Sequence, residues 1–176
     1  MSKTGTNPIE SAKAIFMQYK MLAEKAMNQV ADDTLLWKPD YESNSIYHIV
    51  KHLSGNMQSR WTDFLTSDGE KPWRNRDDEF EQTAPITRHD MMVLWEKGWT
   101  CLFKALDELT PEMLGKHVLI RGEAHSVLEA INRQIAHYSY HVGQIVYLCK
   151  MLQPVQWETL SIARGKSDDF NNKLMK

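Results

Sequence analysis

The spacing of apolar residues is the feature that most constrains the fold of this 176-residue chain. Between residues 12 and 30, apolar side chains recur at alternating steps of four and three residues. The positions are Ala12, Phe16, Tyr19, Ala23, Ala26 and Val30. Such alternation averages about 3.5 residues, so these side chains lie along one face of a helix. The sequence therefore predicts a helix with a single inward-facing seam.

The same step pattern recurs three more times, over residues 46–64, 91–109 and 127–152. Capping residues and prolines mark the ends of these segments. The starts are marked by Asn7, Pro8 and Glu10 for the first, by Thr87 and Asp90 for the third, and by Ser126 and Glu129 for the fourth. Pro111 follows the third segment and Pro154 the fourth. Four long helices with related seams bury those seams against one another. We therefore expect an all-α four-helix bundle, with residues 1–176 forming a single domain.

The connections between the helices constrain their order. Residues 67–86, rich in Pro, Gly and charge, separate the second predicted helix from the third. Short links join antiparallel neighbours, whereas a link this long can run the length of the bundle. The sequence therefore predicts one long crossover and an up-down-down-up order.

Two shorter segments complete the expected architecture. Residues 118–124 carry Arg121–Gly122 at their centre, which predicts a small hairpin before the fourth helix. The tail from Val155 onward retains large apolar side chains, and we expect it to pack back on the bundle. These side chains are Trp157, Leu160, Ile162 and Phe170.

Composition excludes several classes of protein. Hydrophobic residues at 42% and charged residues at 25% are ordinary globular values. A net charge of −2 argues against a nucleic-acid partner, which needs a surplus of Lys and Arg. No apolar run approaches the ~18 residues of a membrane helix, and no secretion signal precedes the first helix, so we expect a cytoplasmic location. Cys101 and Cys149 lie within helical periodicity and are expected to be buried free thiols.

Three polar residues interrupt the apolar seams: Arg60, Gln134 and His141. A buried polar group without a partner costs about 1–3 kcal/mol, so each of the three needs a partner or a ligand. His137 lies one turn before His141 on the same helical face. Two histidines four residues apart commonly present two imidazoles to one metal ion.

A second pair with this spacing, His48 and His52, lies on the second predicted helix. At 100° per residue, His52 falls about 70° from the centre of the seam, and His48 about 40° farther out. His52 is therefore expected to reach the interior and His48 to face solvent. Together with His137 and His141, His52 would supply three neutral imidazoles to one divalent ion and leave a coordination position open, as in catalytic sites.

Two amides lie one turn from these histidines. Asn56 follows His52, and Gln144 follows His141. Either could hold a metal-bound water or orient an imidazole, or could be an ordinary surface amide. The acidic run Asp77–Glu79 is interpreted as a solvated charge cluster rather than an acid pair. No role is assigned to the remaining histidines, which are His89, His117 and His125.

The segment Ile49-Val50-Lys51-His52-Leu53, followed by His137-Tyr-Ser-Tyr-His141-Val-Gly-Gln144-Ile145, resembles the DinB-like superfamily. That superfamily includes the bacillithiol transferases and, more distantly, the mycothiol-dependent maleylpyruvate isomerases. Residues 60–74, Trp157 and residues 160–165 are similar to a subgroup of small bacterial members of uncharacterised function. The resemblance spans nearly the whole chain.

The resemblance implies one divalent ion, nickel or zinc, held by His52, His137 and His141, and often a homodimer. It also implies attachment of a small thiol to an electrophile, which is the activity of the best characterised members. Arg60 would then anchor a carboxylate of either substrate, unless it pairs with a Glu or Asp of the bundle. Metal-dependent hydrolysis and a non-catalytic metal-binding role in stress response remain alternatives. A deep polar cavity beside the ion favours an enzyme, and an ion capped by protein atoms favours a structural role.

Overall fold

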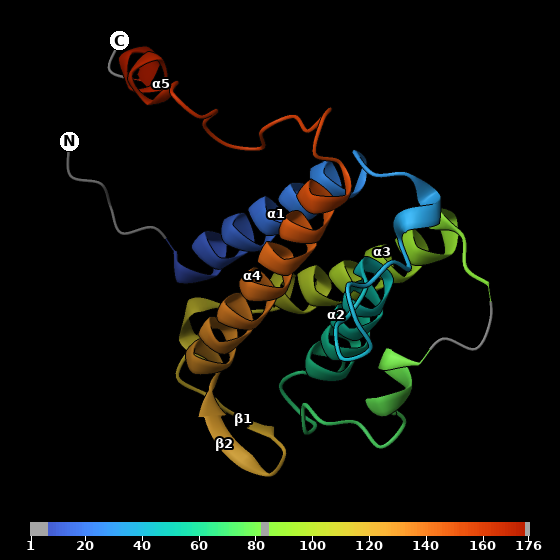
Figure 1. Cartoon of the computed structure of the whole chain (residues 1–176). Helices are drawn as coiled ribbons and strands as arrows, with labels where there is room; N and C mark the ends of the chain where they lie inside the picture. The colour runs from blue at the N-terminus through green and yellow to red at the C-terminus, as the bar shows by residue number, and fades with distance from the viewer. Residues whose placement is uncertain (1–6, 82–84, 175–176) are drawn as a thin grey trace.

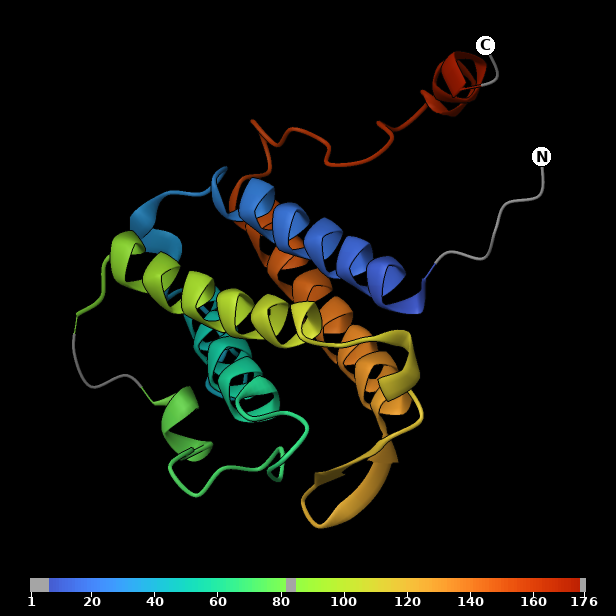
Figure 2. The same cartoon turned by 180° about the vertical axis from the view of Figure 1, so that it is seen from behind.

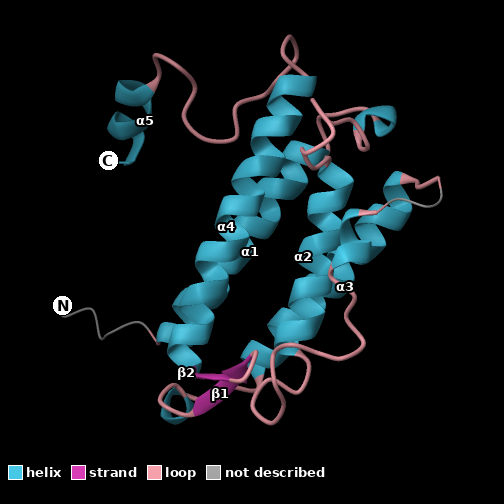
Figure 3. Cartoon of the chain, turned by 60° about the horizontal axis from the view of Figure 1, so that its bottom comes forward, coloured by secondary structure: helices cyan, strands magenta, loops and turns pink. Residues whose placement is uncertain are grey.

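The computed structural model describes residues 7–81 and 85–174, and these are mostly helical (Figures 1 and 3). The long helices are α1 (Pro8–Met27), α2 (Ile46–Trp61), α3 (Arg88–Asp107) and α4 (Val127–Leu152). The shorter elements are the 3-10 turns η1 (Asp32–Thr34), η2 (Asp77–Phe80) and η3 (Pro111–Met113), the strands β1 (His117–Ile120) and β2 (Glu123–Ser126), and helix α5 (Ser167–Leu174). The predicted all-α class broadly fits this content.

The long helices pack in two close pairs, α1 against α4 and α2 against α3, with further contact between α2 and α4 (Figure 1). Each contributes one large aromatic residue to the centre of the core. The Phe16 ring of α1 lies 6.3 Å from Trp61 of α2, 6.3 Å from Trp99 of α3 and 5.8 Å from Tyr138 of α4. Aromatic pairs at such distances add to the stability gained by burying their area.

The predicted seams form most of this core. Their apolar side chains are buried, apart from three that are half-buried, which are Tyr19, Phe64 and Leu152. Capping follows the prediction as well, because Asn7 accepts a hydrogen bond from the Ile9 amide, and complete capping boxes precede α3 and α4. Both cysteines are free thiols, with Cys149 buried and Cys101 half-buried.

Helix α2 ends earlier than its seam predicts. The pattern extends to Phe64, but the helix stops at Trp61, and Thr62 has an extended conformation. Asp63 then adopts a left-handed conformation at φ 48°, which turns the chain into the link toward α3. Phe64 still packs on Trp61, with ring centroids 4.7 Å apart, because the turn folds it back. Phe64 therefore fits the apolar spacing because its side chain packs on the core, although the residue lies outside the helix.

The expected hairpin is present. Strands β1 and β2 pair antiparallel, with His117 opposite Ser126 and Ile120 opposite Glu123. Arg121 and Gly122 form the two-residue loop, both at positive φ, as tight hairpin turns require.

The tail packs back only in part. Trp157 and Leu160 are half-buried against the core, whereas Ile162 and Phe170 are exposed. Helix α5 stands apart from the long helices in two opposite views (Figures 1 and 2). Its sequence is short and mostly polar, so it has little apolar surface to bury. The prediction that the whole tail packs on the bundle is therefore wrong for α5. None of the helices in the described ranges is long and apolar enough to cross a membrane.

The contact between α2 and α3 depends on a glycine. A Cβ atom at Gly98 of α3 would lie 2.9 Å from the Ser54 Cα and 3.1 Å from the Met57 sulfur on α2. We predict that Gly98→Ala lowers the free energy of unfolding by about 1–3 kcal/mol, because the helices must move apart. Urea denaturation measures this loss.

Gly143 on the exposed face of α4 provides the matched control, because a Cβ there meets nothing within 4 Å. Gly143→Ala is expected to raise the free energy of unfolding by about 0.4–1 kcal/mol. Equal effects at the two glycines would contradict the proposed close approach.

Candidate metal site

Three histidines from two helices converge at one point. One ring nitrogen each from His52 of α2 and from His137 and His141 of α4 lies within 4.8 Å of the other two. The Nε2 atoms of His52 and His137 are 3.4 Å apart. His52 and His141 are buried and His137 is half-buried. This group could hold a metal ion, and it contains the three histidines that the sequence predicts.

Two of these imidazoles are held in a fixed orientation through their Nδ1 atoms. The Nδ1 of His52 lies 2.8 Å from a Glu79 carboxylate oxygen, and that of His141 lies 2.8 Å from the Gln144 amide oxygen. Because a carboxylate or amide oxygen only accepts, each Nδ1 is the protonated nitrogen and each Nε2 carries the lone pair. The Nε2 of His141 is buried without a hydrogen-bond partner among the described residues. Such an arrangement is what a metal ion requires of its histidine ligands.

Electrostatics keep the imidazoles of His137 and His141 neutral. Burial, reinforced by the neighbouring imidazoles and by Arg60 and Arg74, lowers the pKa of His137 to about 3. Burial also lowers the pKa of His141 to about 4, although the hydrogen bond to Gln144 opposes the shift. Both rings are therefore unprotonated at neutral pH, which is the form that binds metal.

Glu79 corrects the interpretation of the acidic run as solvated. Its side chain is 7% exposed and accepts two hydrogen bonds from Arg74, at 2.7 and 2.9 Å, besides the one from His52. Burial raises the pKa of the Glu79 carboxyl, but the bonds from His52 and Arg74 outweigh it and hold the pKa below its usual value. Asp77 and Asp78 are exposed, as expected. The prediction failed for Glu79 because η2 turns it against α2.

A glycine in α2 makes room for this carboxylate. A Cβ at Gly55 would lie only 2.1 Å from the Glu79 Oε1. Glycine inside a helix costs about 1 kcal/mol relative to alanine, so its presence one turn after His52 needs a reason. Gly55 is the sequence signal that could have indicated a group approaching His52.

His48 is the second correction. It was expected to face solvent, but it is buried, with its Nδ1 2.7 Å from the Ser45 hydroxyl. Ser45, just before α2, caps the helix and contacts the His48 ring, so a residue outside the periodic seam helps to bury it. Burial lowers the pKa of His48. His48 does not belong to the three-histidine group, as predicted.

The polar candidates differ in their contacts. Gln144 orients His141, as described above. Asn56 is buried and accepts a hydrogen bond from the Tyr138 hydroxyl at 3.1 Å. Gln134 is buried, and its Oε1 has no partner among the described residues. Arg60 donates to the Gly69 carbonyl and lies 3.4 Å from Glu70, so it pairs with an acid, although that acid lies in the link after α2 and not on a helix of the bundle as the alternative role supposed.

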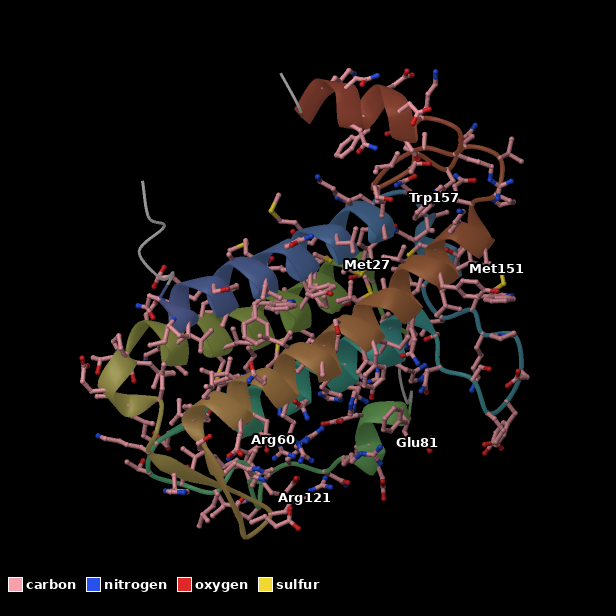
Figure 4. The ribbon with its side chains drawn as sticks, turned by 90° about the vertical axis from the view of Figure 1, so that its left-hand side faces the viewer. Met27, Arg60, Glu81, Arg121, Met151 and Trp157 are labelled. Carbon is pink, nitrogen blue, oxygen red and sulfur yellow. The ribbon has the colours of Figure 1, made fainter. Side chains whose placement is uncertain are left out.

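A cavity of about 230 Å³ opens beside the histidines. Figure 4 shows two of the side chains at this cavity, Arg60 on α2 and Arg121 from the hairpin. The lining residues come from α2, the link between α2 and α3, the hairpin and α4. They are His52, Asn56, Arg60, Arg74, Arg76, Arg121, Arg133, Gln134, His137 and Tyr140.

Comparison with protein families gives one finding. The family model described as "Protein of unknown function (DUF1572)", a member of the DinB-like clan, matches residues 3–166. The resemblance noted in the sequence is thereby confirmed at the level of the clan. No curated protein and no solved structure matches the chain.

The histidine group generates a direct prediction about metal content. We expect His52→Ala, His137→Ala and His141→Ala each to lose most of one bound divalent ion per chain, because two imidazoles bind far more weakly than three. Elemental analysis of protein purified without a metal column measures this. His48→Ala is the control and should keep the ion, although it loses a buried hydrogen bond. Loss of metal from His48→Ala with retention in His52→Ala would refute the assignment.

The contact between Glu79 and His52 generates a second prediction. Glu79→Gln is expected to weaken metal binding about 10–100-fold, because the carboxylate no longer raises the basicity of His52. Gly55→Ala should act in the same direction by displacing Glu79. Competition with a chelator of known affinity measures both. Asp78→Asn, on the same turn but exposed, is the matched control and should leave affinity unchanged.

Proposed function

The chain belongs to the DUF1572 family of the DinB-like clan, and from this premise we propose that it is a metal-dependent enzyme. In this proposal His52, His137 and His141 hold one divalent ion, nickel or zinc. The reaction joins a low-molecular-weight thiol to an electrophile, as the resemblance to bacillithiol transferases implies.

The cavity beside the histidines is the observation that carries the proposal of an enzyme. His52 and His137 line it, so a ligand in the cavity would touch the site itself. A purely structural ion is enclosed by protein ligands and needs no such space. The polar lining and the half-buried His137 therefore favour catalysis over a storage or structural role.

The residues of the site have distinct tasks in this proposal. A divalent ion bound by neutral imidazoles keeps its double charge and lowers the pKa of a bound thiol or water toward about 7. Glu79 and Gln144 hold His52 and His141 with their Nε2 atoms directed inward. In an addition to a double bond, the thiol sulfur would bond to one atom of that bond, the π bond would break, and the thiol proton would pass to the other atom.

We propose also that the four long helices form the up-down-down-up bundle of the DinB-like fold. The Ser54 hydroxyl of α2 donates to the Leu94 carbonyl of α3. Farther along both helices, the Thr62 hydroxyl lies 3.5 Å from the Cys101 sulfur. The two helices therefore advance in the same direction, which the long link between them allows. A homodimer likewise remains a proposal that rests on the resemblance.

The test is an assay of thiol loss against a panel of electrophiles, with several thiols including bacillithiol. We expect metal-loaded protein to accelerate the addition, with an apparent pKa below the ~8.5 of a free cysteine-like thiol. Metal-free protein and His141→Ala should give no acceleration. Equal rates with and without metal, for every thiol, would overturn the proposal. Metal-dependent hydrolysis of ester or amide substrates in the same samples would favour the hydrolase alternative instead.

A further inference from the structure

Arginine dominates the cavity beside the histidines. Five arginines, Arg60, Arg74, Arg76, Arg121 and Arg133, line it, and none of its lining residues within the described ranges is acidic. Guanidinium groups repel one another, and gathering five of them is unfavourable unless anions are present. Two carboxylates, Glu70 and Glu79, pair with arginines of this group and offset only part of this charge.

The arginines differ in how far they are neutralised. Arg74 is held by two hydrogen bonds to Glu79. Arg60 and Arg121 share Glu70, at 3.4 and 2.8 Å. Three arginines thus share two carboxylates.

The other two arginines have weaker compensation. The nearest acid to Arg76 is its exposed neighbour Asp77, at 4.0 Å, a distance at which an exposed pair contributes little. Arg133, one turn before His137 on α4, has no hydrogen bond or ion pair within the described part of the chain. These two guanidinium groups are available to a ligand.

Two buried polar atoms at the cavity also lack partners among the described residues. Gln134 is 3% exposed with a free Oε1, and Arg60 is 6% exposed with a free Nε. Both residues line the cavity. An unpaired buried polar group costs about 1–3 kcal/mol, which a ligand with polar atoms would recover. Because amide oxygen and nitrogen exchange by a flip, Gln134 can also donate to an anion.

The backbone conformation of Arg121 is an unfavourable one for an arginine, which suggests that the side chain is needed at this position. Arg121 has φ 55° in the hairpin loop, where Asn, Asp or Gly is preferred. The Asp68 carboxylate holds this turn by accepting from the amides of Arg121 and Gly122, at 2.8 and 2.7 Å. A left-handed arginine costs about 1–2 kcal/mol, and here it brings a guanidinium to the cavity.

We propose that the cavity binds a small dianion, a dicarboxylate or a phosphate ester, between Arg76, Arg121 and Arg133. The volume of about 230 Å³ is below the ~300–1,000 Å³ of pockets for drug-sized ligands, so the ligand is small. Arg60 is held through its Nη atoms by Gly69 and Glu70, and Arg74 is held by Glu79, so these two arginines shape the site. Arg121 contacts Glu70 through its Nε, which leaves its Nη atoms for the ligand. This assigns the anchoring role expected of Arg60 to other arginines. Only the identification of the dianion as a substrate rests on the proposed function.

Calorimetric titration of the full chain, metal-free and metal-loaded, with succinate, inorganic phosphate and acetate tests the proposal. In both forms we expect at least one dianion to bind with a Kd of about 1 mM or tighter. The monoanion acetate should bind about tenfold more weakly. A preference for succinate identifies a dicarboxylate, and a preference for phosphate identifies a phosphate ester. Acetate binding as tightly as both dianions, or no dianion binding to metal-free protein, would overturn the proposal.

Charge-matched variants locate the site. Arg133→Gln and Arg76→Gln should each weaken dianion binding about tenfold, because each removes a charged hydrogen-bond donor. Arg133→Lys should restore only part of the affinity, since lysine cannot bind bidentately. Arg164→Gln, in the exposed tail, removes the same charge elsewhere and should have no effect. Equal weakening by Arg164→Gln, or none by Arg133→Gln, would refute this site. Dianion binding without thiol addition would overturn the proposed function alone.

Discussion

The candidate site depends on the hydrogen bonds that the buried Glu79 carboxylate accepts from Arg74 and His52. A buried charge is costly unless it is paired and hydrogen-bonded, and Glu79 meets both conditions through Arg74 and His52. The pairing fixes the link between α2 and α3 against α2. It also places Phe80 over the His52 ring, with centroids 5.2 Å apart, so that one face of the imidazole is shielded from solvent.

A second set of polar contacts joins the link between α2 and α3 to the hairpin. Asp68 binds the hairpin turn at Arg121, and the Gly69 amide donates to the Leu119 carbonyl at 2.8 Å. The same link therefore contacts both α2 and the hairpin. Glu70 of the link pairs with Arg60 of α2 and with Arg121 of the hairpin. The helices supply the histidines, and the link and hairpin supply much of the charge around them.

The part of the site that lies on helices could be predicted, and the part that lies on the link could not. Helical geometry fixes the relation between His137 and His141, and the seam directs His52 inward, so three residues follow from periodicity alone. The burial of His48 depends on the chain before α2, and that of Glu79 on a short turn 27 residues after His52. Neither segment has a period from which its contacts could be inferred. Gly55 is the local sequence signal for the contact between Glu79 and His52.

Net charge was equally uninformative about the cavity. The chain carries −2 overall, which argues against a nucleic-acid partner, yet five arginines gather around one small space. The positive charge also acts on the histidines, because Arg60 and Arg74 help to lower the pKa of His137. Arginines that line the cavity thus help to keep an imidazole free for metal. A bound dianion would in turn stabilise a divalent ion nearby, and by reciprocity each ligand would strengthen binding of the other.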